Sequence, residues 1–498
     1  MAIQIRENDV TVKYVDKIGK GQLAAECSID ASAGGVSKIY CVSGGVCVKS
    51  AEAQDGAVRV VCEVTSRVIY ADGAGAYSSA DYVTEITESV SAEGAVAGMP
   101  VSAAASISDV QSEVVGSSIK LQTVVDLDFE GECEYTATLV DEVEGAVSRT
   151  QENDITNLKG GGSDSFTVSE EYETGAAIGK ILSYGAEVFL TSVRAEEGSV
   201  YAEGEVWIQL VYDDGGVCSK QFSHPFAEEL MIADSKADDI VTARACVKGV
   251  SILITGSEEE NVVQMDVTVG VDVRLFEEER IETVADVFSP AAELEVTYIE
   301  KSFTAPEGMK FLSKRVCGSA DVEVEGIRRV LAGVPSFASV SNMYREGGKL
   351  TCEGVINVCE IYETDGGAVD SCAVEIPFSF TSDLKDDGER EVACMGAAVT
   401  DVVSRVRREG EIEVCANVSL QLACMEKCVL QGVSHIEVGQ ERELDMGGIS
   451  VLTVARGETL WDVAKALNVS ERDIAAQNPF VEKGIKEGDK IIVFRCMA

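Results

Sequence analysis

The sequence predicts a mainly β protein: three tandem antiparallel β-sandwich-like domains followed by a small βααβ domain. Three observations carry this prediction. A strand–turn–strand pattern occurs three times at near-constant spacing, each copy ends in a long alternating strand, and the last segment changes to a helical period. With 498 residues, the chain is long enough for three or four domains. We expect β-domains at 1–150, 165–290 and 300–440, and the βααβ domain at 450–495.

The repeated pattern is a strand that begins after a glycine, ends near a tyrosine and leads into an Asp-Gly turn. Glycine and tyrosine are fourteen residues apart in each copy, and the copies are offset by 142 and then 150 residues. Asp-Gly after a β-rich run predicts a hairpin, because glycine adopts the positive φ angle that such a turn requires. The pairs are Gly56 and Tyr70, Gly198 and Tyr212, and Gly348 and Tyr362.

Each copy continues into a long strand with a period of two. This period places one face on a core and the other toward solvent, which is typical of antiparallel sheets. The positions on one face are Ile119, Leu121, Thr123, Val125, Leu127 and Phe129 in the first copy, Met265, Val267, Val269, Val271, Val273 and Leu275 in the second, and Ile412, Val414, Ala416, Val418, Leu420 and Leu422 in the third.

The first copy is expected to be the divergent one. After the Asp-Gly turn the later copies contain Pro225-Phe226 and Pro377-Phe378, which the first copy lacks. Proline at this place fits a strand start or an edge strand, because it donates no hydrogen bond to a neighbouring strand. We predict linkers around 153–164, which contains three consecutive glycines, near 289–293, and at 437–448.

The charge of the chain argues against several classes of partner. The net charge is −45, and the segment from Ser450 onward holds seven basic and seven acidic residues, so the excess lies before it. Such a surface repels nucleic acid and anionic lipid. No apolar run approaches the roughly 18 residues of a spanning helix, and the first residues lack the apolar region of a signal peptide. We expect no nucleic-acid partner, no membrane insertion and a cytoplasmic location.

The sixteen cysteines form no compact framework. Without an export signal, we expect free thiols in a reducing cytosol, several of them acting as small apolar residues of strands. Oxidative cross-linking after release from a cell is the alternative. Cys424 and Cys428 are close in sequence, but histidine support for a zinc site is thin, so we expect no metal and no other cofactor.

An enzymatic function finds little support in the sequence. The two histidines, His224 and His435, lie in different surroundings, which makes a Ser/His/Asp or Cys/His site hard to build. No P-loop occurs, nor does a dinucleotide-binding glycine motif at a strand–helix junction. The 86 acidic residues bring carboxylates together by chance, so a glycosidase pair is not indicated. We expect a protein that is not an enzyme and has no catalytic residues.

The last segment has the pattern of two short helices between two strands. Ser470 is a good N-cap for the second helix, with Asp473 as its capping-box partner. Val469 and Ile474 stand at the staple positions on either side of this cap. The apolar stripe of the first helix is Leu460, Val463, Ala464 and Leu467, and the expected strands contain Val454 before the helices and Ile491, Ile492 and Val493 after them.

This segment resembles a LysM domain, the small unit with which many bacterial proteins bind N-acetylglucosamine polymers. In that family the sugar lies between the loop after the first strand and the loop after the second helix. Glu458 stands where Asp is common, and Val493-Phe494 replaces the usual Ile-Pro. The alternative is that the glycine and Asn-Pro positions are only turn residues. The resemblance implies a binding site at Gly457, Glu458, Thr459 and Leu460 and at Asn478, Pro479, Phe480 and Ile485.

The threefold hairpin followed by a LysM-like segment resembles the SPOCS-domain proteins of spore-forming clostridia and their relatives. That resemblance implies a non-enzymatic scaffold of spore-coat assembly in the mother cell, at the forespore surface. Its LysM domain would dock on the stage IV sporulation ATPase, a coat basement-layer protein, with Leu460, Trp461 and Phe480 as candidate contacts. The alternative is a cell-wall protein that binds peptidoglycan or another N-acetylglucosamine-containing glycan.

Overall fold

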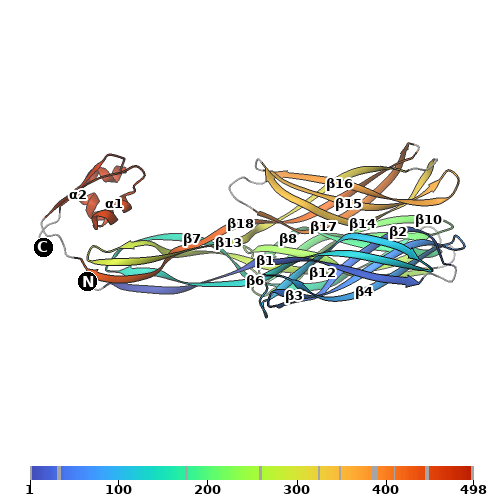
Figure 1. The fold of residues 1–498 in the computed structure, drawn as a ribbon, viewed down its shortest axis with the longest axis horizontal. Helices are drawn as coiled ribbons and strands as arrows, with labels where there is room; N and C mark the ends of the chain where they lie inside the picture. The colour runs from blue at the N-terminus through green and yellow to red at the C-terminus, as the bar shows by residue number, and fades with distance from the viewer. Residues whose placement is uncertain are drawn as a thin grey trace.

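The computed structural model describes residues 3–30, 35–173, 178–256, 261–322, 326–346, 349–383, 391–408, 410–442 and 448–494. Within these ranges, eighteen strands form six three-stranded antiparallel sheets, two for each third of the chain, and a two-stranded sheet with short helices follows (Figure 1). The predicted fold class, mainly β with a terminal βααβ domain, is confirmed.

The strands of each third, called a repeat below, have the same order and similar lengths. An outer sheet contains the first, sixth and fifth strands, and an inner sheet contains the second, third and fourth. The first repeat comprises β1 (Gln4–Asp30), β2 (Val36–Gln54), β3 (Ala57–Asp72), β4 (Tyr77–Ser91), β5 (Val101–Val115) and β6 (Ser118–Glu144). The second comprises β7 (Val147–Glu173), β8 (Lys180–Glu196), β9 (Ser199–Asp213), β10 (Val217–Met231), β11 (Ile240–Gly256) and β12 (Asn261–Phe288). The third comprises β13 (Ala292–Asp321), β14 (Ile327–Glu346), β15 (Lys349–Thr364), β16 (Val369–Asp383), β17 (Glu391–Arg408) and β18 (Glu411–Glu441).

The alternating strands are the central strands of the outer sheets, β6, β12 and β18. Every residue that the pattern assigns to the core side is buried there, including Thr123, whose hydroxyl lies 3.2 Å from that of Ser66. Burying one Val or Leu side chain contributes about 1.5–3 kcal/mol, so these faces make a large contribution to the stability of each repeat. The predicted Asp-Gly hairpin turns follow Tyr70, Tyr212 and Tyr362. In the second turn Gly215 has the expected positive φ angle, 69°, whereas in the first and third turns the positive φ angles belong to Gly75 (84°) and Gly367 (80°) rather than to Gly73 and Gly366.

The first and last strands of each repeat extend past the rest of their sheet as a two-stranded ribbon. The ribbons pair 4–15 with 132–144, 147–157 with 277–288, and 292–305 with 426–441. Their apolar faces pack together, with Val12, Ile155 and Leu430 contributed by the three different repeats. We call this three-ribbon assembly the stalk; it is the narrow half of the molecule in Figure 1.

The remaining parts of the three repeats form the broad half of the molecule, which we call the head (Figure 1). Its inner sheets meet in one apolar cluster to which each repeat contributes, for example with Ile69, Val211 and Ile361. The three repeats therefore share a core in the head and another in the stalk, and together they form one body.

Two of the predicted linkers lie in strands. Residues 153–164 belong to β7, where Gly161 pairs with Arg274 of β12. A Cβ atom on Gly161 would lie 2.2 Å from the Val273 carbonyl oxygen, so the glycine allows a close approach of two strands. The predicted joint at 437–448 begins within β18, which continues to Glu441. Segment 289–293 does contain the short turn between β12 and β13.

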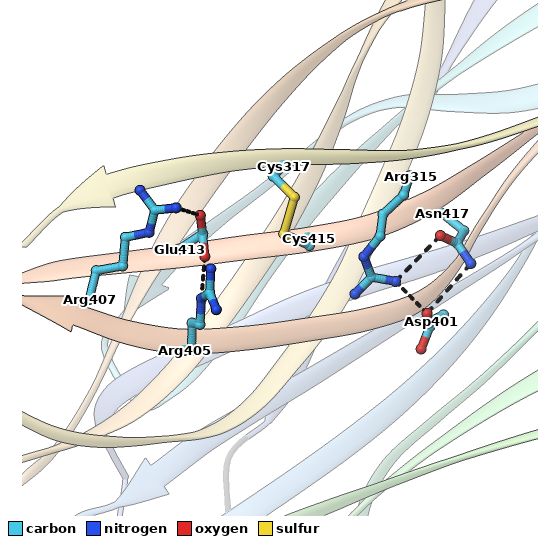
Figure 2. The surroundings of a disulfide bond; sticks show 8 residues. All are labelled: Arg315, Cys317, Asp401, Arg405, Arg407, Glu413, Cys415 and Asn417. Atoms are coloured by element: carbon cyan, nitrogen blue, oxygen red, sulfur yellow. Dashed lines mark hydrogen bonds and ion pairs between the residues drawn. A yellow bond between two sulfur atoms is a disulfide. The ribbon is translucent and has the colours of Figure 1, made fainter.

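The expectation of free thiols is wrong for two cysteines. Cys317 and Cys415 are directly opposite each other on β13 and β18 and form a disulfide (Figure 2). Sequence spacing gave no indication of this pair, because the two residues are 98 positions apart. The other cysteines within the described ranges are free thiols, many of them buried. In the same part of the chain, no group of three or more histidine, cysteine or acidic side chains could hold a metal ion, and no helix is long and apolar enough to cross a membrane.

Candidate functional site

The terminal module consists of β19 (Ile449–Thr453), α1 (Leu460–Leu467), α2 (Glu471–Gln477), the 3₁₀ helix η1 (Pro479–Lys483) and β20 (Lys490–Phe494). Thr459 caps α1 and forms a capping box with Asp462. Ser470 caps α2 as predicted, with its hydroxyl accepting the Asp473 N–H at 3.1 Å. The predicted apolar stripe and staple residues pack into one core with β20. The helices thus hold two loops at fixed positions beside the small sheet.

The first predicted ligand loop, 457–460, is exposed at its start. Gly457 has a φ angle of 84°, and no atom lies within 4 Å of the position that a side chain would take. The Glu458 carboxylate accepts the Ala455 N–H at 2.7 Å and closes the turn. Thr459 is occupied as the helix cap, and Leu460 is half-buried against the core. This loop therefore presents its backbone at the glycine, while most of its side chains have structural contacts.

The second predicted ligand loop has a buried part and an exposed part. Asn478 is 4% exposed, and its side-chain amide donates to carbonyl groups of α2 and β20 and accepts an N–H from β20. These bonds hold the helix on the sheet, so this amide is committed within the domain. Pro479 begins η1, Ile485 is half-buried in the core, and Phe480 is 42% exposed. Phe480 is thus the ring in this loop that can contact a ligand or partner.

Trp461 packs against the stalk. Its ring centroid lies 5.2 Å from that of Phe288 in an edge-on arrangement, and its indole N–H donates to Asp286 across 2.8 Å. Lys465, one helical turn further on, lies 2.7 Å from the same carboxylate. The side chain of Trp461 is 6% exposed. The residue that the sequence suggests as a partner contact is therefore used inside the chain, where it docks the module on the end of β12.

Asp286 is the electrostatic centre of this docking contact. Besides the bonds from Trp461 and Lys465, its carboxylate accepts a hydrogen bond from the Tyr298 hydroxyl at 2.6 Å. Burial alone would raise the pKa of Asp286, but the hydrogen bonds from Lys465, Tyr298 and Trp461 outweigh burial and lower the pKa. Burial, together with the bond to Asp286, raises the pKa of Tyr298. The carboxylate is thus ionised and the phenol protonated at neutral pH, which is the arrangement that holds the contact.

The outer face of the terminal sheet is apolar and open. Its cross-strand pairs are Ile449 with Phe494 and Val451 with Ile492. These four side chains are 65%, 53%, 58% and 37% exposed, respectively. Contiguous exposed apolar residues of this kind mark interaction surfaces more often than ordinary surface. We call these four residues the apolar hairpin face.

The sequence interpretation missed two of these features. The apolar hairpin face had a signal: Ile491 to Phe494 are four consecutive apolar residues, whereas a strand with one solvated face alternates. The docking contact had none, because Asp286 precedes Trp461 by 175 residues and no local pattern links them.

Comparisons with known families agree with this architecture. The model described as SipL, SPOCS domain matches residues 35–115 and 177–255, and the LysM domain model matches residues 452–494. The SPOCS matches span β2 to β5 and β8 to β11, so they cover strands of the first two repeats, including the copy expected to be divergent, and do not extend to the third repeat. No curated protein and no solved structure matches the chain. The chain thus contains SPOCS-domain segments in its first two repeats and a LysM domain at 452–494.

Proposed function

We propose that this protein is a non-enzymatic scaffold of spore-envelope assembly whose LysM domain attaches it to a partner. SPOCS and LysM domains are binding domains without catalytic function, and the first of them associates the chain with sporulation. The proposed domains are the three repeats, with boundaries at the turns between β6 and β7 and between β12 and β13, and the terminal LysM domain. The three repeats share one core in the head and another in the stalk, so they form a single body. Such a body is suited to act as a spacer between what binds at the head and what binds at the end of the stalk.

The partner of the LysM domain is, in this proposal, a protein of the coat basement layer, the stage IV sporulation ATPase. The observation that carries protein docking is the apolar hairpin face, with Val451 58% and Phe494 53% exposed. Apolar side chains of this size gain stability from burial against a protein surface. A sugar chain, by contrast, would use the loops around Gly457 and Phe480. The second candidate function, binding of peptidoglycan or another N-acetylglucosamine-containing glycan, rests on those exposed loops.

Three variants of the full-length protein, one of them a matched control, separate the candidates. Val451→Asp places a charge on the apolar hairpin face, and Thr453→Asp places the same charge further along the same face of β19 as a matched control. We expect the first substitution to abolish co-purification with the purified ATPase and the second to reduce it little. Phe480→Ala tests the loops in the same assay and in a peptidoglycan pull-down. Retention on peptidoglycan that Phe480→Ala abolishes, without ATPase binding, would favour the cell-wall protein.

The site of action gives an independent test. The proposal places the protein in the mother cell, on the forespore surface. A fluorescent fusion in sporulating cells should form a ring around the forespore, and the Val451→Asp variant should lose it. A diffuse or septal signal for the unaltered protein would contradict the scaffold.

A further inference from the structure

The three repeats meet in the head at three equivalent junctions. At each junction the second strand of one repeat lies beside the fifth strand of another: β2 beside β11, β8 beside β17, and β14 beside β5. The arrangement is cyclic, so each junction is built from the same two strand positions. Residues at equivalent register positions can therefore be compared directly.

The junction between the second and third repeats differs from the other two in its side chains. Phe189 pairs with Glu205 across β8 and β9, and Trp207 follows two positions later on the same face. The equivalent residues are Cys47, Glu63 and Thr65 in the first repeat and Ser339, Val355 and Asn357 in the third. Both aromatic rings are thus particular to the second repeat.

A cavity of about 450 Å³ lies at this junction. Phe189, Glu205 and Trp207 line it from the second repeat, and Asp401 and Asn417 line it from the third. Asp401 stands at a bulge in β17 with a φ angle of 50°, a left-handed conformation that is unfavourable for a residue with a side chain. Bulges of this kind redirect side chains, and here the redirected carboxylate lies at the wall of the cavity.

The charges around the cavity are unequal. The Asp401 carboxylate accepts a hydrogen bond from the Arg315 guanidinium at 2.5 Å, and Asn417 lies beside both groups (Figure 2). The side-chain carboxylate of Glu205, on the opposite wall, has no hydrogen bond or ion pair with any other residue that the structure describes. The charge of Asp401 is therefore neutralised, whereas the charge of Glu205 is not. The Glu205 carboxylate lies next to aromatic rings, in a chain whose net charge is −45.

We propose that this cavity binds an organic cation, a guanidinium or ammonium group on a short apolar stem. Glu205 provides the counter-charge, and Phe189 and Trp207 provide ring surfaces that attract cations. An anionic ligand would meet the unpaired carboxylate and the negative field of the chain. The cation can come from a small molecule or from the Arg or Lys side chain of a partner protein. The site lies in the head, so it is independent of whatever the LysM domain binds.

The two tryptophans of the chain make the test direct. Trp461→Phe leaves Trp207 as the remaining tryptophan, so its fluorescence reports on the cavity. We expect saturable quenching by N-acetylarginine amide and none by N-acetylcitrulline amide, which has the same shape without the charge. Isothermal calorimetry on the unaltered full-length chain gives the same affinity without any substitution. An arginine-containing peptide that binds much more tightly than the capped amino acid indicates a partner protein as the source, and equal affinity indicates a small molecule.

The matched variants are Glu205→Gln and Glu63→Gln, which remove one charge at equivalent positions of two repeats. We expect Glu205→Gln to weaken binding at least about tenfold, because the loss of one partner of a close charge pair is costly. Glu63→Gln should leave it unchanged. Equal binding of the citrulline compound, no effect of Glu205→Gln, or an equal effect of both variants would overturn the proposal.

Discussion

Trp461 and Asp286 lie 2.8 Å apart, indole nitrogen to carboxylate oxygen, and this bond joins the LysM domain to a strand 175 residues earlier in the chain. The same carboxylate binds Lys465, and Phe288 packs edge-on against the indole. The end of the stalk therefore fixes the orientation of the LysM domain. This docking contact leaves exposed the apolar hairpin face, which lies on the outer side of the small sheet.

Replacing Asp286 with Asn should release the LysM domain from the stalk. The variant keeps the shape of the side chain but loses the charge that Lys465 and Trp461 bind, and hydrogen bonds to charged groups contribute about 1.5–3 kcal/mol each. We expect red-shifted Trp461 fluorescence and a larger radius of gyration in solution scattering. Asp154→Asn, at an exposed ion pair of the stalk with Arg280, is the control and should change neither. Unchanged scattering for Asp286→Asn would show that other contacts suffice.

The docking contact should also depend on pH in the acid range. The pKa of Asp286 is lowered on folding from its ordinary value of 3.8. A carboxyl whose folded pKa is depressed contributes stability that is present above its unfolded pKa and is lost as the pH falls through the folded value. We expect docking to be constant from about pH 5 to 8, to weaken as the pH falls below about 3.8, and to be lost as the pH falls through the lower folded pKa. Trp461 fluorescence in a Trp207→Phe background measures this, and Asp286→Asn should abolish the acid transition.

Local patterns were enough to predict the strands, the turns and the helix caps. On β18, each of the predicted core positions, every second residue from Ile412 to Leu422, is buried. The period of two could be predicted because it depends on the geometry of the strand backbone alone. Likewise, Ser470 caps α2 through a bond to a residue three positions away. Such features involve neighbours in sequence, and sequence reading detects them.

Features that join distant residues could not be predicted in this way. The three glycines of 160–162 suggested a flexible linker, yet Gly161 lies in a strand where the Val273 carbonyl leaves no room for a side chain. The stalk depends on Val12, Ile155 and Leu430 meeting from three repeats, and each of them alone reads as an ordinary strand residue. In the LysM domain, the sequence could not distinguish the exposed ring of Phe480 from the committed amide of Asn478.

A buried ion cluster should stabilise the contact between the first two repeats. Glu130 of β6 binds Arg244 of β11 and Arg274 of β12 at 2.9 and 2.6 Å. Burial would raise the pKa of Glu130, but the two arginines outweigh it and lower the pKa. Removing one partner of a buried ion pair costs about 3–5 kcal/mol, so Glu130→Gln should lower the unfolding temperature markedly. Glu142→Gln, at an exposed ion pair with Arg6, should cost about 1 kcal/mol or less.

The disulfide of the third repeat should make its stability sensitive to reductant. Cys317 and Cys415 close a loop of 98 residues, and disulfides typically contribute about 2–4 kcal/mol, mainly by restricting the unfolded chain. We expect dithiothreitol to lower the unfolding temperature of the unaltered protein. A variant with both cysteines replaced by serine should unfold at the lower temperature with or without reductant. Equal unfolding temperatures for the oxidised and reduced protein would contradict this role.

One thiol pair should form a new disulfide between repeats under mild oxidation. Cys47 of β2 accepts a hydrogen bond from Cys246 of β11, which lowers the pKa of the Cys47 thiol although burial opposes it. Its thiolate can attack glutathione disulfide and release one glutathione, and Cys246 then displaces the second, so two protein thiols are oxidised and one disulfide is reduced. Peptide mapping without reductant should show this link, forming faster as the pH rises toward 7 and beyond. Cys62, whose pKa burial raises to about 11, serves as the internal control and should remain a thiol. Equal modification of Cys62, or cross-links without preference for the Cys47–Cys246 pair, would contradict the prediction.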